Sequence, residues 1–469
     1  MALADVQAVA RNEDGIATVL GILAQRFGER FQTGQAIRAQ HSHTTTYLPS
    51  QAPDGVAFAR STEDVQEIVR VCAQHRVPVI PFGTGTSLEG HVNAPGGGIS
   101  IDLSGMNKVL AVHAEDLDCT VEAGVTRQDL NTYLRDTGLF FPIDPGANAS
   151  LGGMASTRAS GTNAVRYGTM RENVLSVKAV MPDGAIVTTA KRARKSSAGY
   201  DLTRLLVGAE GTLGVITELT VRLYGIPQAI SGGVCPFPDV DSACKAVIET
   251  VQMGVPVARI ELINGLGMRA FNNYAKLGYP ETPCLFVEFH GTDAGVKEEA
   301  ETFGEIAAAH GGGPFRWTAD ADERNRLWKA RHDAYWAGMT LRPGARALST
   351  DVCVPISRLA ECIVETEADI ARSGLVAPIV GHVGDGNFHV LALMDMDDAR
   401  EIEAVEAFVA RLNMRAIAMD GTCTGEHGIG QGKMAFLPHE LGAGVDVMRA
   451  IKQALDPQDI MNPGKVLPI

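Results

Sequence analysis

The sequence predicts an α+β protein of two domains, and three observations support this prediction. The chain has 469 residues, of which 45% are hydrophobic, and this length exceeds what one hydrophobic core normally organises. Glycine-rich loops lie between residues 81 and 216. Further along, strand patterns at 257–262 and 284–289 alternate with helical patterns and adjoin a hairpin. This mixture favours an α+β cap with an antiparallel sheet over a second doubly wound sheet. The helical patterns cover residues 239–253, 294–309, 321–340 and 356–372.

Charge and cysteine spacing exclude several classes of partner and cofactor. A formal net charge of -14 argues against nucleic acid or an anionic membrane surface as a partner, because both select for an excess of Lys and Arg. The eight cysteines never form a C-x-x-C spacing. That pattern argues against zinc ribbons, iron–sulfur clusters and covalent haem, and it favours free thiols in a reducing compartment.

The N-terminal residues show no targeting pattern. The segment Met1–Val6 has no basic region followed by an apolar region, as a secretory signal would have. No uninterrupted apolar run reaches the roughly 18 residues that a membrane span requires. We therefore expect a soluble, cytoplasmic protein with no transmembrane segment, and peripheral attachment at the inner membrane is left open.

A first glycine-rich loop follows a short buried strand. The strand pattern Val77–Ile80 leads into Pro81–Gly90, which contains three glycines and three hydroxyl side chains. Such a loop exposes backbone N–H groups and small donors, as a phosphate or pyrophosphate requires. Taken alone, it also fits a tight structural turn. The G-x-G-x-x-G spacing before a helix is absent, which argues against a nicotinamide dinucleotide.

Two further glycine-rich tracts extend the predicted ligand site. From Gly146 to Ala164 nearly every residue is Gly, Ala, Ser or Thr. A core segment of this composition would leave cavities, so we expect its backbone to lie against a large flat ligand. A third tract, Val207–Ile216, leads into a strand. Three such loops, far apart in sequence, predict one extended ligand that is contacted from several sides.

The stretch Gly381–His389 predicts half of a metal site. An Asp-Gly pair at 385–386 is a strong signal for a two-residue hairpin turn. In that register His382 faces His389, with Cβ atoms about 4.5 to 5.5 Å apart, and Asn387 shares their face. A catalytic metal site usually takes three protein ligands and leaves one position open.

The segment Gly425-Glu-His-Gly428 supplies the missing groups. We assign Glu426 as the third ligand, which gives a His2Glu set suited to Zn²⁺ or Mn²⁺. His427 points elsewhere in any regular element and is left for proton transfer, since an unperturbed histidine has a pKa of about 6.5. A zinc-dependent hydrolase would use the same ligands, but it leaves the three glycine-rich loops unexplained.

The loops together resemble a known family. Pro81–Gly90, Asp144–Gly168, Gly208–Ile216 and Met461–Lys465 are similar to the FAD-binding signature of the vanillyl-alcohol oxidase/p-cresol methylhydroxylase superfamily. The similarity runs from about residue 50 to the end. Within it, residues 382–389 and 425–430 resemble the marks of the FAD-linked D-2-hydroxy-acid dehydrogenases. That family includes the cytochrome-linked D-lactate dehydrogenases, the flavoprotein subunit of glycolate oxidase and the D-2-hydroxyglutarate dehydrogenases.

The resemblance implies a two-subdomain FAD-binding domain over residues 1–227 and a substrate cap over 228–446 that carries the metal site, with the tail 447–469 returning to the flavin. It implies non-covalent FAD, although His91 follows the first loop and some members of the wider superfamily carry a covalent flavin link. The implied cofactor contacts are Pro81, Gly83, Thr84, Gly85, Thr86, Ser87, Pro145, Gly146, Gly152, Gly153, Ser156, Thr157, Ser160, Gly161, Tyr167, Gly168, Glu210, Gly211, Gly214, Ile216 and Asn462.

The resemblance also implies the reaction. A 2-hydroxy acid would chelate the metal while hydride passes from C2 to flavin N5. Arg331 would hold the carboxylate, Tyr335 would lie one helical turn further on, and Asn387 and His427 would touch the substrate. Ser349 stands where the 2-hydroxyglutarate enzymes have a lysine, so D-lactate, oxidised to pyruvate, is favoured over glycolate and 2-hydroxyglutarate. Electrons would pass to cytochrome c, a quinone or a partner redox subunit, and a homodimer is left open.

Overall fold

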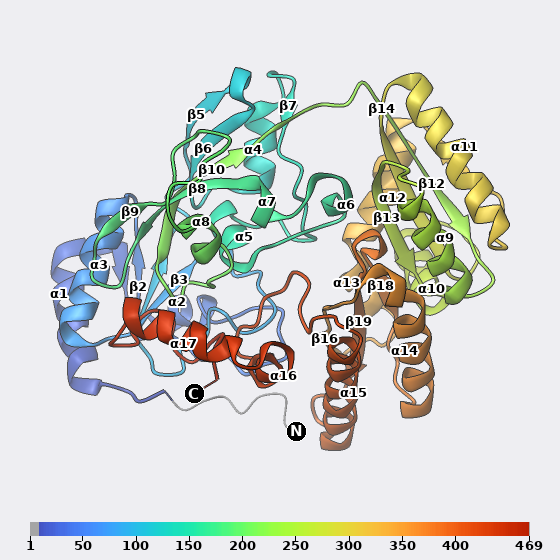
Figure 1. Ribbon diagram of the computed structural model, residues 1–469. Helices are drawn as coiled ribbons and strands as arrows, with labels where there is room; N and C mark the ends of the chain where they lie inside the picture. The colour runs from blue at the N-terminus through green and yellow to red at the C-terminus, as the bar shows by residue number, and fades with distance from the viewer. Residues whose placement is uncertain (1–8, 469) are drawn as a thin grey trace.

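The computed structural model describes residues 9–468 as two bodies that lie side by side (Figure 1). The first body contains the strands up to residue 225, and the second contains those from residue 229 to residue 394. The segment Met1–Val6, on which the expectation about targeting depended, lies outside the described residues. No helix in the described part of the chain is long and apolar enough to cross a membrane.

The first body begins with a four-stranded sheet in the order β1-β2-β4-β3. Its three longer strands are parallel, and the short β1 pairs antiparallel with β2. Helices α1 and α3 pack together beside this sheet. Ser61 caps α3 by accepting a hydrogen bond from the backbone N–H of Asp64. The elements are α1 (Glu13–Phe27), β1 (Phe31–Gln32), α2 (Gln35–Gln40), β2 (Gly55–Phe58), α3 (Thr62–His75), β3 (Val79–Phe82) and β4 (Ile99–Asp102).

A five-stranded antiparallel sheet completes the first body, in the order β5-β6-β10-β8-β9. One continuous hydrophobic core joins both sheets. The elements are β5 (Val109–His113), β6 (Asp118–Glu122), α4 (Arg127–Leu134), β7 (Leu139–Phe140), α5 (Leu151–Thr157), α6 (Ala164–Tyr167), α7 (Met170–Asn173), β8 (Val174–Val180), β9 (Ile186–Thr188), α8 (Leu202–Leu206), β10 (Val215–Arg222) and β11 (Tyr224–Gly225), which pairs with β7.

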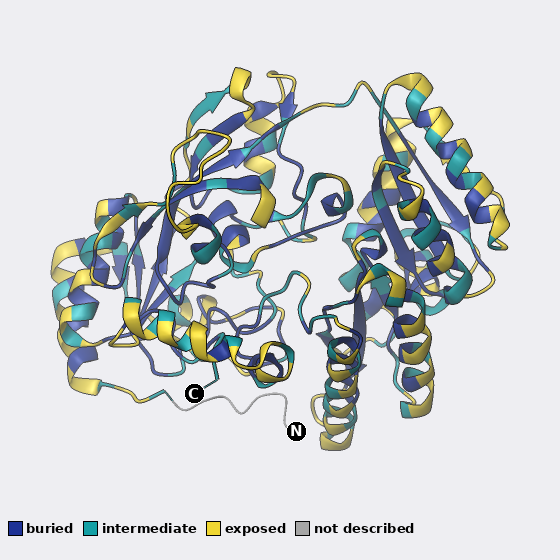
Figure 2. Cartoon of the chain, viewed as in Figure 1, coloured by how far each residue is buried: buried dark blue, intermediate teal, exposed yellow. Residues whose placement is uncertain are grey.

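The second body is built on an antiparallel sheet in the order β15-β12-β14-β13-β18-β19-β16, with β17 also paired to β19. Its central strands are almost wholly buried (Figure 2), because helices cover them and pack with them in a separate core. The strands are β12 (Ala229–Pro236), β13 (Val257–Ile263), β14 (Cys284–Gly291), β15 (Arg316–Thr318), β16 (Arg346–Ser349), β17 (Val352–Cys353), β18 (Ile379–Gly381) and β19 (Asn387–Met394).

The helices of the second body follow the apolar spacing of the sequence, with one exception. The pattern at 321–340 predicted one helix, but the structure has two, which meet at Asp333. Asp333 both ends the first helix and precedes the second, so the chain changes direction there. The helices are α9 (Val240–Gln252), α10 (Gly265–Ala275), α11 (Asp293–Ala309), α12 (Ala321–His332), α13 (Ala334–Met339), α14 (Leu359–Ser373) and α15 (Ala399–Ala418).

The C-terminal segment returns to the first body. After α16 (Leu437–Leu441), helix α17 (Gly444–Leu455) runs across that body in Figure 1. Met461 then forms a parallel bridge with Val79 of β3, and the backbone N–H of Asn462 donates to the carbonyl of Val79 at 2.8 Å. Ile460 and Met461 belong to the core of the first body. The tail is therefore part of the sheet from which the first glycine-rich loop starts.

A buried ion pair joins the two bodies. Asp144 of the first body lies 3.2 Å from Nη2 of Arg259, which is on β13 of the second. Asp144 also accepts hydrogen bonds from Thr162 and from the backbone N–H of Asn163. Although burial raises the pKa of Asp144, the Arg259 guanidinium and these hydrogen bonds outweigh it and hold the pKa well below its usual value.

Replacing Asp144 with Asn should lower the free energy of unfolding by about 3 kcal/mol, because the buried charge of Arg259 loses one of its partners. Arg259 keeps its second partner, Glu288, at 3.5 Å. The expected loss of unfolding free energy is therefore at the lower end of the range for a broken buried ion pair. The pKa is lower in the folded state, so this stabilisation is present above the unfolded pKa of about 3.9 and is lost as the pH falls below it.

Thermal unfolding at neutral pH measures the effect, with Asp136→Asn as the exposed control. An equal melting temperature for Asp144→Asn and the wild-type protein would contradict the role of this pair.

Candidate functional site

One cavity of about 1290 Å³ lies where the two bodies meet, and both contribute residues to its wall. Ligand pockets usually measure about 300 to 1,000 Å³, so the cavity has room for a large cofactor together with a small substrate. All three glycine-rich loops reach it. Of the predicted cofactor contacts, the structure places these on its wall: Pro81, Gly83, Thr84, Gly85, Thr86, Ser87, Pro145, Gly146, Gly152, Gly153, Ser156, Thr157, Ser160, Glu210, Gly211, Gly214, Ile216 and Asn462.

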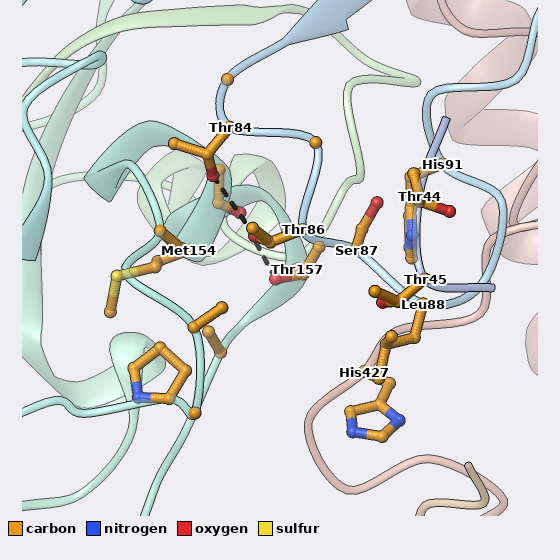
Figure 3. Close-up of a pocket in the computed structure, with 18 of the residues that line it drawn as sticks. Thr44, Thr45, Thr84, Thr86, Ser87, Leu88, His91, Met154, Thr157 and His427 are labelled. Atoms are coloured by element: carbon orange, nitrogen blue, oxygen red, sulfur yellow. Dashed lines mark hydrogen bonds between the residues drawn. The ribbon is translucent and has the colours of Figure 1, made fainter. Parts of the chain in front are cut away.

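The first loop presents small groups to the cavity. It begins where β3 ends, and the hydroxyls of Thr84 and Thr86 lie 3.2 Å apart on its surface (Figure 3). At Gly83 an added Cβ would collide with the hydroxyl of Ser150, so the loop packs against the second tract with no room for a side chain. In Figure 3, Met154 and Thr157 lie on one side of the cavity and His427 lies on the other.

Three of the predicted cofactor contacts make other contacts within the protein. Gly161 has a φ of +149° and packs against the backbone of Asp144. The hydroxyl of Tyr167 lies 2.7 Å from Nδ1 of His290 in the second body, and Gly168 caps α6. None of the three is among the described residues on the cavity wall.

No pattern in residues 1–50 predicted a site, yet the structure brings eight of them to the cavity: Ala36, Ala39, Gln40, Ser42, His43, Thr44, Thr45 and Ser50. His91, with 6% of its surface exposed, also reaches the wall. The one signal in the sequence was the run of three threonines at 44–46, which has the same small hydroxyl character as the first loop.

His382 and His389 come together, but the predicted hairpin register is wrong. Val380, and not His382, pairs with His389 between β18 and β19. A single 3₁₀ turn, Val383–Asp385, replaces the two-residue turn. Gly386 ends this turn with a φ of +80°, and an added Cβ there would collide with the carbonyl of Val354. The longer turn still places the two imidazole rings 5.3 Å apart, centre to centre.

Glu426 lies against both imidazoles. Its Oε1 is 3.1 Å from Nε2 of His382 and 3.3 Å from Nε2 of His389. One nitrogen or oxygen atom from each of the three residues falls within 4.8 Å of the others. The second oxygen, Oε2, is buried and has no hydrogen-bond partner in the structure. Two nitrogens and one carboxylate oxygen converge on one point, as a divalent cation requires.

The other ring nitrogens fix how the imidazoles point. Nδ1 of His382 lies 2.8 Å from Glu261 on β13, and Nδ1 of His389 lies 2.9 Å from the carbonyl of Thr350. Both partners are acceptors, so each Nδ1 donates a hydrogen bond to its partner, and each Nε2, beside Glu426, is the nitrogen left to bind a metal. Glu261 was read from the sequence only as part of a strand.

The loop that carries Glu426 and His427 is held by two buried carboxylates. Asp351 accepts the backbone N–H groups of Glu426 and His427, at 2.9 and 2.7 Å. Glu210 of the first body accepts the N–H groups of residues 429 and 430. At Gly428, with a φ of +82°, a Cβ would come within 2.6 Å of Glu210, so only glycine fits between the loop and that carboxylate.

A second cluster, formed by Asp351, His389 and His427, also brings its donor atoms together. It is less suited to a metal, because Asp351 already accepts four hydrogen bonds. His389 likewise directs its Nδ1 at a carbonyl. The His2Glu set is therefore the better metal site.

His427 is available as a base. Its ring stacks on that of His389, with centres 5.0 Å apart and an angle of 11°, and it lines the cavity. Burial lowers the pKa of His427 to about 4, so the imidazole is neutral at neutral pH and can accept a proton.

Arg331 and Tyr335 also reach the cavity, although not from one helix face as predicted. Arg331 lies in the last turn of α12, and Tyr335 lies in α13 beyond the break at Asp333. The Nε of Arg331 donates to Glu261 at 2.8 Å. Arg331 is the only Arg or Lys among the described residues of the cavity wall.

Asn387 is not on the described cavity wall. Its amide donates to Asp351 and to the carbonyl of Val352, both at 2.9 Å. It shares a strand face with His389 as predicted, but the structure turns its amide toward Asp351. Its predicted contact with substrate is therefore not seen in the geometry.

The donor chemistry of the cavity fits both implied groups. Small hydroxyls and closely packed glycines on one side suit a dinucleotide that lies against backbone. The unpartnered Glu426 oxygen and two presented imidazole nitrogens suit a divalent cation. Among solved structures, the fold is similar to p-cresol methylhydroxylase with substrate bound, with a TM-score of 0.82 over 97% of each chain and 16% identity. At this identity the likeness shows that the two proteins share a fold.

The chain belongs to the FAD-linked oxidases. Residues 226–466 match the C-terminal domain model of that family, and residues 53–190 match the FAD-binding domain model. A Danio rerio protein named probable D-lactate dehydrogenase, mitochondrial, is 53% identical over 94% of this chain and 89% of its own length. An Arabidopsis thaliana D-lactate dehydrogenase (cytochrome) is 48% identical over 89% and 74%. The glycolate oxidase subunit GlcD of Bacillus subtilis is 32% identical over 93% and 94%.

The family confirms the predicted FAD cofactor and the predicted fold, and it removes the hydrolase alternative. It contradicts the expected cytoplasmic location, because the D-lactate dehydrogenase relatives at 40% identity or more are named as mitochondrial proteins. That expectation depended on the lack of a secretory signal and of a membrane span, and neither absence specifies a compartment.

Replacing Gly153 with Leu should weaken FAD binding about tenfold or more, because the new side chain would project into the cavity. Only the hydroxyl of Ser150 approaches the position of the new Cβ, and leucine favours the helix α5. Flavin absorbance per protein after dialysis measures the loss. Gly21→Leu on the exposed face of α1, where a Cβ meets nothing, is the matched control. Equal flavin retention in both variants would place the flavin elsewhere.

Proposed function

We propose that the protein is an FAD- and metal-dependent D-2-hydroxy-acid dehydrogenase that oxidises D-lactate to pyruvate. The observation that carries this proposal is the convergence of three kinds of group at one end of the flavin cavity: the His2Glu set, the neutral His427 and Arg331. The relatives that share 40 to 53% of the sequence and carry the name D-lactate dehydrogenase support it.

Bound FAD supplies the two-electron acceptor for the oxidation, and a divalent Zn²⁺ or Mn²⁺ held by His382, His389 and Glu426 supplies a Lewis acid for the substrate oxygens. Arg331 binds the substrate carboxylate through its guanidinium and so fixes the position of C2. His427 accepts the proton of the 2-hydroxyl group as the C–H bond breaks. Tyr335 lines the same cavity.

The wall beside Arg331 supports a small monocarboxylate. Phe271, Val380 and Leu391 make it apolar, and Ser349 at the end of β16 supplies only a hydroxyl. With no second Arg or Lys among the described wall residues, a second carboxylate would be buried without a counter-charge, at a cost of several kcal/mol. A 2-hydroxy diacid is therefore disfavoured.

The absorption spectrum and a substrate series test the function together. The purified protein should show flavin bands that D-lactate bleaches without an added acceptor. With an artificial dye as acceptor, rates should follow the order D-lactate and D-2-hydroxybutyrate above glycolate, with D-2-hydroxyglutarate lowest. A protein that turns over D-2-hydroxyglutarate fastest would reject the proposed substrate. Replacing the dye with cytochrome c or a quinone then tests these carriers as the electron acceptor.

Removing the metal should abolish D-lactate oxidation while flavin absorbance is unchanged, because the ligands of the two groups are separate side chains. Treatment with a chelator, followed by gel filtration and addition of Zn²⁺ or Mn²⁺, measures both the loss and the recovery. Full activity in a preparation that contains no metal by elemental analysis would refute the role of the His2Glu set.

Replacing His427 with Gln should lower kcat by about 10² to 10⁴, the usual contribution of a general base. Metal content and flavin content should be unchanged, because His427 is outside the His2Glu set. His113→Gln is the control, since His113 pairs with Asp118 away from the cavity. An unchanged kcat would assign proton transfer to another group.

A further inference from the structure

One buried carboxylate joins the two halves of the proposed catalytic site. Glu261 lies on β13 with 1% of its surface exposed, and each of its oxygens serves a different partner. Oε1 is 2.8 Å from Nδ1 of His382. Oε2 is 2.8 Å from Nε and 2.6 Å from Nη2 of Arg331. Glu261 itself is not among the described residues of the cavity wall.

We infer that Glu261 is a positioning residue that couples metal binding to recognition of the substrate carboxylate. This inference rests on the proposed function, because it assigns His382 to the metal and Arg331 to the substrate. Glu261 acts on His382 and Arg331 through hydrogen bonds, and it contacts neither the metal nor the substrate itself. It therefore fixes the orientation of a metal-binding residue and of a substrate-binding residue at the same time.

On the histidine side, Glu261 selects the tautomer. A carboxylate can only accept a hydrogen bond, so the proton of a neutral His382 stays on Nδ1 and the lone pair stays on Nε2. Nε2 is the atom that faces Glu426, at 3.1 Å. A partner that fixes a ligating histidine in this way typically contributes 10- to 100-fold to metal affinity or activity.

On the arginine side, Glu261 fixes which edge of the guanidinium faces the cavity. It occupies the Nε edge of Arg331, and it is the only carboxylate paired with Arg331 in the part of the chain that the structure describes. A guanidinium has five N–H donors in a fixed fork. When one edge is held, the remaining donors keep one orientation toward the substrate, and less conformational freedom is lost when the carboxylate binds.

Glutamine at position 261 cannot serve both partners. If its carbonyl oxygen accepts from Arg331, its NH2 group faces Nδ1 of His382 and drives the histidine proton onto Nε2, where it blocks the metal. In the opposite orientation the NH2 group faces the donors of Arg331. Either orientation breaks one half of the site. The variant Glu261→Gln therefore tests the coupling without a change in side-chain shape.

A matched control lies on the neighbouring strand. Glu288 of β14 is also buried, and it also bridges a histidine and an arginine, namely His290 at 2.8 Å and Arg259 at 3.5 Å. It is absent from the described cavity wall and contacts none of the three metal-binding residues. Glu288→Gln thus removes a buried bridging charge of the same kind, away from the site.

The first experiment titrates metal-stripped flavoprotein with Zn²⁺ or Mn²⁺ by calorimetry, and separately measures KM and kcat for D-lactate in metal-saturated protein. For Glu261→Gln we expect metal affinity to fall by about 10- to 100-fold, or KM to rise by a similar factor, with flavin content unchanged. Glu288→Gln should change neither. If Glu261→Gln retains little flavin, Glu261→Asp keeps the charge but is one methylene too short to reach both partners, and the same losses are expected.

The second experiment is a double-mutant cycle on metal affinity. Arg331 is not a metal ligand, yet Arg331→Met should change metal affinity by at least about 2-fold when Glu261 is present, and should have no effect in the Glu261→Gln background. An equal effect in both backgrounds would overturn the coupling.

These outcomes separate the inference from the proposed function. Wild-type metal affinity and KM in both Glu261 variants, with a wild-type protein that binds metal and oxidises D-lactate, would overturn the inference alone. A wild-type protein that binds no metal would overturn both.

Discussion

The loop of residues 425–430 is held between the two bodies by carboxylates that accept its backbone N–H groups. Asp351 from the second body holds residues 426 and 427, and Glu210 from the first body holds residues 429 and 430. Hydrogen bonds to a charged acceptor contribute about 1.5 to 3 kcal/mol each. The His2Glu set, His427 and the glycine-rich loops keep their relative positions only while both carboxylates stay ionised. Burial opposes this, but nearby cations and N–H donors outweigh it and lower the pKa of both groups.

Buried charges are also paired at other points of the interface between the bodies. Asp144 with Arg259 and Glu89 with Lys433 are further buried pairs, and each would be costly to leave unpaired. Such pairs add less net stability than apolar packing, but they tolerate only one arrangement of the two surfaces. A site assembled from loops far apart in sequence needs that precision, because a displacement of about 1 Å can cost 10²-fold in rate.

Local sequence patterns predicted those parts of the site that depend on local chemistry. Glycine and hydroxyl composition identified three loops that the structure places on the wall of one cavity, and the motifs that contain His382, His389 and Glu426 identified a set that the structure brings together. The hairpin register failed because tertiary contacts decided it: at Gly384 and Gly386 the turn packs against Val165, Ile260 and Val354, which favours a 3₁₀ turn over the two-residue turn. Glu261 was missed although charged residues alternate in Val-Ala-Arg-Ile-Glu-Leu-Ile, 257–263. That alternation signals a polar face, but only the fold shows which partners face it.

The bridge between Val79 and Met461 has a consequence for how the protein is made. A ribosome releases Val79 long before Met461, and the whole second body is synthesised between them. The sheet that leads into the first glycine-rich loop therefore lacks one of its pairings until the second body has emerged. Contacts of such long sequence separation form slowly, because a large loop must close before they contribute. The second body, with its own core, can fold as a unit first, and the first body can complete its sheet only after synthesis reaches the tail.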